Sequence, residues 1–330
     1  MRIIMLGLNF GLAFALLLLT TAKSFAEPLP VDDNSWLRKM VLAAHKTDYS
    51  GTFIYQSGNY VETSRITHIF DGTNELERLE GLDGERSEII RKNGQVWCYL
   101  GDRMVLATKQ EGARTFPALL PEQLSLLAEN YVTRPGEKIR VAGFQAHSIL
   151  FQPRDKMRYA HKMWAQSDTG LLLKAVVLDE HSHVIEQYVF TQLKIGGDID
   201  RKWILERKAA DKNAIENPES NTNGRATPSE SGWRVYALPA GFKKITEVTR
   251  RMRDDQEPVT HLVYSDGLAG ISVFIEKLRD KAAIKAGFYS KGVIQVYSKM
   301  LDENLLTVVG EVPAHTVMQV AESVRYGGHP

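Results

Sequence analysis

The sequence predicts a mixed α+β protein of two domains, most of it antiparallel sheet with a few helices. Three observations predict this class: short β-type runs separated by Asp-Gly or Asn-Gly turns, a polar stretch near residue 201, and a second β-rich stretch beyond it. Repeated short strands joined by tight turns are typical of antiparallel meanders. A chain of 330 residues is also long enough for two domains.

The first 26 residues predict a secretory signal peptide. Arg2 gives a positive start, residues 3–22 are uncharged, and Ser24-Phe25-Ala26 is a small-x-small cleavage site. A retained membrane anchor is the alternative, because the apolar run is nearly long enough to span a bilayer. We expect cleavage after Ala26 and a mature protein in the bacterial periplasm.

Composition excludes some classes of partner. The chain has 41 Lys and Arg against 40 Asp and Glu, and the leader holds two of the basic residues, so the mature chain keeps 39 against 40. This balance gives no electrostatic reason for nucleic-acid binding. Cys98 is the only cysteine, so no internal disulfide can form, and its apolar surroundings favour a packed thiol over a reactive one.

The first domain is expected over residues 27–200. It begins with a helix at 35–46, in which Trp36, Met40, Ala43 and Ala44 share one face. The period then changes to that of strands. We expect strands at 49–55, 61–70, 75–82, 85–92 and 95–100, a helix at 121–130, and strands at 138–141, 146–151, 158–166, 170–179 and 184–194.

Residues 201–232 form a polar linker between the two predicted domains. The stretch is poor in apolar residues and rich in Pro, Ser, Asn and Gly. Such a segment lets two domains change their relative position, which makes it a candidate hinge.

The second domain, expected over residues 233–330, is a smaller α+β unit. Its terminal helix is predicted at 313–326, because Val317, Val320, Ala321 and Val324 recur at helical spacing. We expect a strand and a turn within 233–242, then strands at 259–264, 270–276, 293–300 and 305–309.

No motif predicts catalysis. The sequence lacks a Gly-x-Ser-x-Gly elbow, a phosphate-binding glycine loop and a zincin motif. Ser265 and Asp266 are neighbours, which is poor geometry for a relay, so with Gly267 they are better interpreted as a turn. His181 and His183 are too few for a zinc site, and a polar hairpin turn is favoured there. We therefore expect no enzyme, no catalytic residue, no metal and no cofactor.

The hairpin at 263–276, VYSDGLAGISVFIE, is the most informative stretch of the second domain. Strand alternation predicts two faces, and an exposed Tyr-Phe pair on one of them would suit a bound peptide. The alternative is that the terminal helix covers this face. We expect Val263, Ile271, Val273 and Ile275 on the core face, and Tyr264, Ser272, Phe274 and Glu276 on the opposite face.

The first domain also offers a candidate lipid pocket. A curved antiparallel sheet with helices across one face can enclose an apolar cavity. Ordinary core packing is the alternative for each residue that would line it. The candidate lining residues are Phe53, Ile54, Tyr55, Ile69, Phe70, Trp97 and Trp164.

Seven motifs occur in an order that resembles the MucB/RseB family, the periplasmic regulators of the envelope-stress (sigma-E, or alginate) sigma factor. The resemblance extends over residues 34–326. The motifs are YSGTFIY at 49–55, RVAG at 140–143, RYAHKMW at 158–164 with TGLLLK at 169–174, EQYVFTQL at 186–193, LPAGF at 238–242, HLVYSDGLAGISVFIE at 261–276 and VVGEVP at 308–313.

The resemblance implies a non-enzymatic negative regulator. Such proteins bind the periplasmic region of a membrane-spanning anti-sigma factor (RseA or MucA), protect it from site-1 proteolysis, and release it on sensing lipid, lipopolysaccharide or lipoprotein signals. It also implies a LolA/LolB-like incomplete β-barrel for the first domain. A homo-oligomer is left open, and the rival interpretation is a periplasmic carrier of lipids or lipoproteins.

The resemblance further implies that the contact surface lies mainly in the small domain. The candidate partner-binding residues are Phe242, Tyr264, Ser265, Asp266, Gly267, Leu268, Ser272, Phe274 and Glu276. Two departures stand out: His161 occupies a position where Tyr is often expected, and His181-Ser182-His183 replaces an expected glycine-bearing turn.

Overall fold

The structure is a computed structural model that describes residues 33–93, 95–101, 103–107, 115–201, 203, 227–228, 230–250, 257–278 and 286–327. The expected signal peptide and most of the expected linker lie outside these ranges. Within them, no helix is both long enough and apolar enough to cross a membrane.

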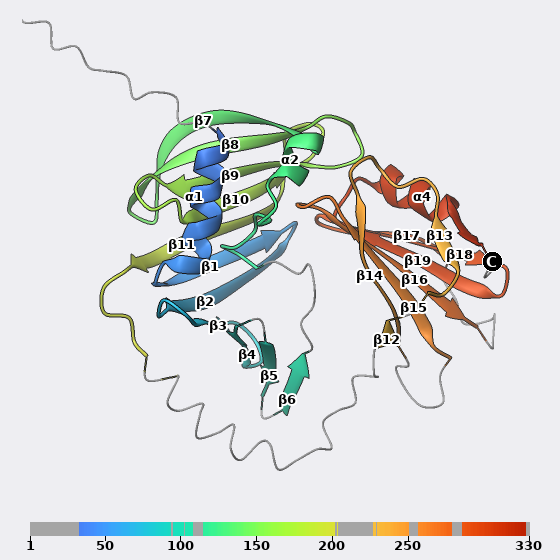
Figure 1. Ribbon diagram of the computed structural model, residues 1–330, viewed down its shortest axis with the longest axis horizontal. Coiled ribbons are helices and arrows are strands. Elements are labelled where there is room, and N and C mark those ends of the chain that lie inside the picture. The colour runs from blue at the N-terminus through green and yellow to red at the C-terminus, as the bar shows by residue number, and fades with distance from the viewer. Residues whose placement is uncertain are drawn as a thin grey trace, which may run out of the picture. The chain divides into compact units, whose positions relative to one another are not determined.

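The N-terminal domain is built on one eleven-stranded antiparallel sheet (Figure 1). The strand order is β6-β5-β4-β3-β2-β1-β11-β10-β9-β8-β7, so β6 and β7 form two edges and the sheet is open. The strands are β1 (Tyr49–Ser57), β2 (Tyr60–Phe70), β3 (Glu75–Gly81), β4 (Ser87–Lys92), β5 (Gln95–Leu100), β6 (Arg103–Ala107), β7 (Tyr131–Val141), β8 (Phe144–Pro153), β9 (Ala160–Gln166), β10 (Leu172–Leu178) and β11 (Val184–Ile195).

Helix α1 (Asp33–Lys46) covers one face of this sheet, as Figure 1 shows. Its apolar residues Leu37, Met40 and Ala43 are buried with Phe53 of β1 and Ile66 of β2. The predicted helix and its buried face are therefore confirmed. The repeat of apolar residues at helical spacing drives this packing, since only one face of the helix is removed from water.

A smaller apolar cluster contains Ile69, Ile90, Ile199 and Trp203. Ile69 is three residues after Ile66 on β2, so the two side chains point to opposite faces of the sheet. Trp203 comes from the start of the expected linker and is buried. The chain is therefore anchored to the first domain at least to this tryptophan.

Among the predicted elements of the first domain, three have bounds that change the place of a particular residue. Helix α2 spans only Ser125–Asn130, so Pro121 precedes the helix instead of standing in its first turn. Strand β7 begins at Tyr131, seven residues earlier than expected, and passes Pro135 through a register shift. Strand β9 begins at Ala160, which leaves Arg158 in the preceding loop.

The C-terminal domain contains a seven-stranded antiparallel sheet of order β12-β14-β15-β16-β19-β18-β17 and a separate pair, β13-β20. Helix α4 (Ala314–Glu322) contacts β18 and β19. The strands are β12 (Thr227–Pro228), β13 (Trp233–Val235), β14 (Lys243–Arg250), β15 (Val259–Ser265), β16 (Gly270–Lys277), β17 (Gly287–Lys291), β18 (Ile294–Leu301), β19 (Asn304–Gly310) and β20 (Val324–Tyr326).

The terminal helix is shorter than predicted, although its buried face is correct. Val317, Val320 and Ala321 are fully buried in the second core. The helix ends at Glu322, and Val324 reaches the same core from β20, which pairs with β13. An apolar residue at that spacing fits both a helix face and a short strand, so the pattern did not separate them.

The face assignments of Val263 and Tyr264 in the 263–276 hairpin are wrong. Ile271, Val273 and Ile275 of β16 are buried as expected, but Tyr264 is only 5% exposed and belongs to the same core. Register explains this, because Tyr264 pairs with Ile271 and directly opposed residues share a face, whereas Val263 pairs with Ser272 on the other face. The expected exposed Tyr-Phe pair therefore does not exist, and Phe274 instead stacks on His261.

Helix α1 is tied to the sheet by a shared carboxylate. Glu75 Oε1 of β3 lies 2.7 Å from His45 Nδ1 of α1 and 3.1 Å from His68 Nε2 of β2. Burial alone would raise the pKa of Glu75, but the hydrogen bonds from the two histidines outweigh it and hold that pKa at about 2. The bond to Glu75 raises the pKa of His45 above its usual 6.5, although partial burial opposes it.

These opposite shifts predict a pH window for the helix contact. The depressed pKa of Glu75 gives stability that is present above pH 4.5 and is lost as the pH falls toward about 2. The raised pKa of His45 gives stability that is present below 6.5 and is lost as the pH rises past it. Urea unfolding should therefore show the largest difference between wild type and Glu75→Gln at about pH 5–6. The exposed Glu129→Gln is the control, and an E75Q difference that does not change with pH would contradict this assignment.

Candidate interdomain site

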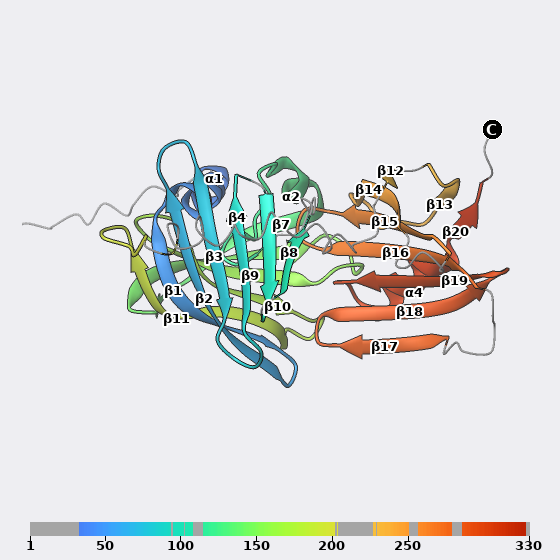
Figure 2. The ribbon, with the colours of Figure 1, turned by 90° about the horizontal axis from the view of Figure 1, so that it is seen from below.

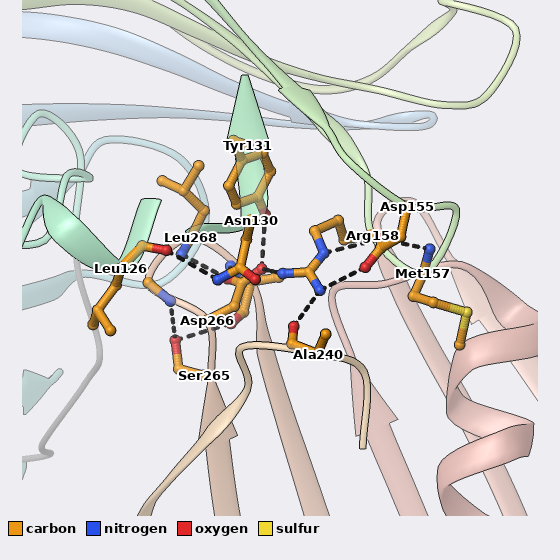
Figure 3. A network of polar contacts seen from close by, with 12 residues as sticks. Leu126, Asn130, Tyr131, Asp155, Met157, Arg158, Ala240, Ser265, Asp266 and Leu268 are labelled. Carbon is orange, nitrogen blue, oxygen red and sulfur yellow. Dashed lines mark hydrogen bonds and ion pairs between the residues drawn. The ribbon is translucent and has the colours of Figure 1, made fainter. Parts of the chain in front are cut away.

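A buried carboxylate, Asp266, joins the C-terminal hairpin to the N-terminal domain (Figure 3). Its Oδ1 accepts hydrogen bonds from the backbone N–H groups of Leu268 (2.9 Å) and Ala269 (2.8 Å). Its Oδ2 accepts hydrogen bonds from Arg158 Nη1 (2.6 Å) and Tyr131 Oη (2.9 Å). One oxygen therefore builds the turn between β15 and β16, and the other holds the neighbouring domain.

The local sequence explains why the carboxylate stands there. Gly267 has φ +106°, a conformation that glycine adopts without strain. The Ser265 hydroxyl donates to the carbonyl of Ala269 at 2.9 Å and accepts the N–H of Gly267 at 3.1 Å. The predicted Ser-Asp-Gly turn is confirmed, and the serine hydroxyl is engaged within it.

Arg158 lies in the loop between β8 and β9, and its side chain is fully buried. Its Nε and Nη2 bind the two carboxylate oxygens of Asp155 at 3.1 and 2.8 Å. Nη2 also donates to the carbonyl of Ala240 at 2.6 Å, so each guanidinium nitrogen has an acceptor. Burial lowers the pKa of Arg158, but Asp155 and Asp266 outweigh this and raise it, so the side chain stays charged.

Aromatic rings surround this ion pair. The guanidinium carbon lies 5.7 Å from the ring of Tyr131 and 5.2 Å from that of Phe242. Burial and the Asp266 charge raise the pKa of Tyr131 well above 10, which keeps its hydroxyl a donor. Rings exclude water from the pair, and a lower local dielectric strengthens its attraction.

His161 lies at the margin of the same group. Its ring centroid is 6.1 Å from that of Tyr131, and its buried Nε2 has no hydrogen-bond partner among the described residues. Burial lowers the pKa of His161 to about 4, although the charge of Asp266 opposes this. The imidazole is therefore neutral at physiological pH and acts as a packing group beside the ion pair.

Two further contacts bring the domains close around the ion pair. Gly241 has φ +79°, and a Cβ placed on it would lie 2.0 Å from Asn130 Oδ1. The Thr316 hydroxyl of α4 donates to the carbonyl of Met157 at 3.0 Å. A residue larger than glycine fits at position 241 only if the side chain of Asn130 moves.

A second contact involves the turn after β17. Lys291 Nζ lies 5.0 Å from the ring centroid of Tyr60 at the start of β2. A Cβ on Gly292 would lie 1.8 Å from Ser57 Oγ of β1, and Gln295 Nε2 donates to Tyr159 Oη at 3.4 Å. Lys291 of β17 and the turn after it therefore touch the tip of the β1–β2 hairpin, whereas Gln295 of β18 contacts Tyr159, which precedes β9.

The candidate partner-binding residues fall into three groups in the structure. Phe242, Asp266, Gly267 and Leu268 face the N-terminal domain, and Leu268 packs against its core. Ser265 is part of the turn, and Tyr264 lies in the C-terminal core. Ser272, Phe274 and Glu276 lie on the sheet face opposite α4 and are half-buried.

The candidate lipid-pocket residues do not line one described cavity. Phe53 and Trp164 belong to the main core of the first domain, whereas Ile69 and Trp97 pack in the smaller cluster. Ile54, Tyr55 and Phe70 are half-buried. A pocket of about 10 Å³ beneath α1 has room for about one water molecule. It is lined by Met40, Val41, Ala44, His45, Pro117, Ala118, Leu120 and Leu172.

His181 and His183 lie in the turn before β11, and the side chain of Asp179 caps this turn. The carboxylate of Asp179 accepts the backbone N–H groups of His181 and His183, and Ser182 has φ +65° where a glycine was expected. Across the described part of the chain, no group of three or more His, Cys, Asp or Glu side chains is arranged to hold a metal ion.

Sequence reasoning missed Arg158, Tyr131 and Asp155. Arg158 opens one of the motifs that carry the family resemblance, but nothing in the motif connects it with an aspartate 108 residues away. Tyr131 was expected outside any strand. A buried pair between separate domains leaves no local periodicity, so only the structure brings these residues together.

Two antiparallel sheets joined by a buried ion pair define a two-domain β-rich protein. Sequence comparison then identifies the family. The sequence model of the MucB/RseB N-terminal domain matches residues 32–208, and that of the MucB/RseB C-terminal domain matches residues 227–325. The chain belongs to the MucB/RseB family, which confirms the resemblance seen in its motifs.

Relatives match along nearly the whole chain. The sigma factor AlgU regulatory protein MucB of Pseudomonas aeruginosa is 33% identical over 315 residues, which cover 94% of this chain and 96% of the relative. The sigma-E factor regulatory protein RseB of Escherichia coli K12 is 23% identical over 94% of this chain and 95% of its own length.

Solved structures agree with the fold. The structure of the Pseudomonas aeruginosa MucA/MucB complex matches with a TM-score of 0.70 and 29% identity, over 91% of this chain and all of that one. A crystal structure of MucB with MucA(peri) matches with a TM-score of 0.69 and 30% identity, over 90% of this chain and all of that one. Both domains are therefore built as in these structures.

The ion pair predicts a large effect for a small substitution. Asp266→Asn keeps the Oδ1 acceptor of the turn but removes the charge that faces Arg158. Breaking a buried pair leaves an uncompensated charge, so the free energy of unfolding in urea should fall by about 3–5 kcal/mol. Asp302→Asn, in the exposed turn between β18 and β19, is the matched control and should stay within about 0.5 kcal/mol. Equal stability of both variants would show that the pair does not hold the domains.

Gly241 provides a second test with an internal control. Gly241→Ala should loosen the contact between α2 and the C-terminal domain, because the new Cβ collides with Asn130. Gly143→Ala measures the conformational cost alone, since Gly143 has φ +87° and no heavy atom within 4 Å of the added Cβ. Hydrogen exchange at residues 125–131 should rise only in G241A, and adding Asn130→Ala should partly reverse the rise. If G143A and G241A behave alike, the close approach is unimportant.

Proposed function

We propose that this protein is a periplasmic regulator that binds the periplasmic region of a membrane-spanning anti-sigma factor. By covering that region it protects the anti-sigma factor from site-1 proteolysis and keeps the envelope-stress sigma factor inactive. The observation that carries the proposal is the match along nearly the whole chain to MucB, whose solved structures include a complex with MucA(peri).

The geometry of the two domains supports this proposal. A partner that contacts both domains needs them in one arrangement, and the ion pair of Arg158 and Asp266 favours one. Binding of a partner to this protein also requires no catalytic reaction. The described groups at the centre of the contact are an ion pair, a phenol and an apolar ring, which bind and orient but do not form a nucleophile with its base.

The proposed organisation follows from the same function. A leader over residues 1–26 would send the chain to the periplasm, with cleavage after Ala26. Residues 27–200 and 233–330 would form most of the two domains and residues 201–232 the connection, apart from Trp203, which packs in the first domain, and β12, which pairs with β14 in the second. Control of release by lipid, lipopolysaccharide or lipoprotein signals stays a prediction. The pocket beneath α1 has room for about one water molecule, so lipid entry there would require α1 or its neighbours to move.

Binding of the anti-sigma tail is the decisive measurement. The mature chain, purified from the periplasm with its intact mass recorded, is titrated with the periplasmic region of the organism's own MucA-like anti-sigma factor. We expect a saturable one-to-one complex and slower cleavage of the tail by the site-1 protease. If the measured mass does not correspond to a chain that begins at Glu27, the assignment of residues 1–26 as a cleaved leader is wrong.

Two results would point elsewhere. If the tail is not retained, the regulator proposal fails. If instead the protein transfers lipid or lipoprotein between vesicles and ignores the tail, the carrier interpretation is correct. Retention that is unaffected by added lipid or lipopolysaccharide would remove only the sensing step.

A further inference from the structure

The outer edge of β17 differs from the sheet edges at β7 and β12. Figure 2 shows β17 as the outermost strand of the C-terminal sheet, beyond β18. Its five residues are all exposed, and no described strand pairs with its outer side. Strand edges carry rows of backbone N–H and C=O groups that pair readily with another extended chain.

Proteins usually protect such edges, and two edges of this molecule show the usual devices. Strand β7 carries Pro135, a register shift and several charged side chains. Strand β12 is only two residues long and ends in Pro228. Strand β17 has neither proline nor register shift along its pairing with β18, and its only charge is the terminal Lys291. The edge is therefore open to pairing.

Two aromatic side chains flank this edge on opposite faces. Phe288 pairs with Tyr297 on the α4 side, and Tyr289 pairs with Val296 on the other side. They are 48% and 60% exposed, which is unusual for residues of this size on a strand of a folded domain. A chain added along β17 would find a backbone ladder with an aromatic contact on each face.

The edge also leads toward the first domain. Lys291, the last residue of β17, lies against the ring of Tyr60, and Tyr60 and Val61 of β2 are exposed. An extended segment longer than β17 would therefore continue onto apolar side chains of the N-terminal domain. A second copy of this chain fits less well, because a five-residue strand paired with itself about Tyr289 would leave Tyr60 and Val61 uncovered.

We propose that an extended, apolar-rich segment of the anti-sigma factor's periplasmic region adds to the outer edge of β17 as an eighth strand and continues over Tyr60 and Val61. Main-chain hydrogen bonds give such an added strand its affinity, and the flanking side chains give it specificity. This inference rests on the proposed function and specifies where and how the partner binds. It also makes partner binding depend on the domain arrangement, since the two parts of the surface lie on different domains.

Lysine substitutions on the edge test the proposal, because lysine is a device that protects natural edges. Tyr289→Lys and Phe288→Lys change exposed side chains, so both variants should keep the wild-type thermal unfolding midpoint. Each should weaken binding of the purified anti-sigma tail by at least about tenfold, as expected when an interface loses an aromatic anchor. Tyr236→Lys is the matched control, since Tyr236 is 67% exposed in the same domain but lies away from β17, and it should bind as wild type does.

Hydrogen exchange shows how the tail binds. Amides of residues 287–291 that point outward should gain protection when the tail is added to the wild-type protein. If wild type binds the tail and both lysine variants bind it equally well, β17 is not the site, although the proposed function stands. If wild type does not bind the tail, both proposals fail together. If the amides are already protected in the free protein in a concentration-dependent way, a second copy occupies the edge and the inference is wrong.

Discussion

The arrangement of this molecule depends on one buried contact, the ion pair between Arg158 and Asp266. Taking two charges out of water costs several kcal/mol per ion, and only close geometry and further hydrogen bonds offset that cost. Here each guanidinium nitrogen has an acceptor, and Tyr131 shares the carboxylate. Such a pair tolerates little displacement, so the contacts of Gly241, Thr316 and Lys291 all follow from the same relative position of the domains.

This constraint changes what the C-terminal hairpin can do. Its turn was the strongest candidate for a partner surface, yet Asp266, Gly267 and Leu268 face the protein's own first domain. In the described part of the small domain, the half-buried sheet face around Phe274 and the edge at β17 remain accessible to another chain. The two ends of the small domain thus have different roles. The hairpin turn at Asp266 orients the large domain, and the free edge of the small domain at β17 is available to a partner.

Local patterns predicted most strands and both large helices, because burial of one face leaves a period in the sequence. The predictions failed where the same spacing of apolar residues fits two different local conformations. Val324 continues the helical spacing of α4 but belongs to β20, and in β15 the adjacent apolar residues Val263 and Tyr264 left the phase of the strand ambiguous. The ion pair could not be predicted at all, since its members are 108 residues apart and each is an ordinary polar residue in its own segment.

The turn around Asp266 has one more consequence, which concerns conformational entropy. The two backbone N–H groups bound to Oδ1 hold the carboxylate in a single rotamer through contacts within the hairpin itself. The acceptor for Arg158 is therefore already oriented before the domains meet, and docking does not have to order it. Immobilising a flexible side chain at an interface typically costs about 0.5–1.5 kcal/mol. A preorganised aspartate therefore holds the two domains more firmly than a mobile glutamate at the same place would.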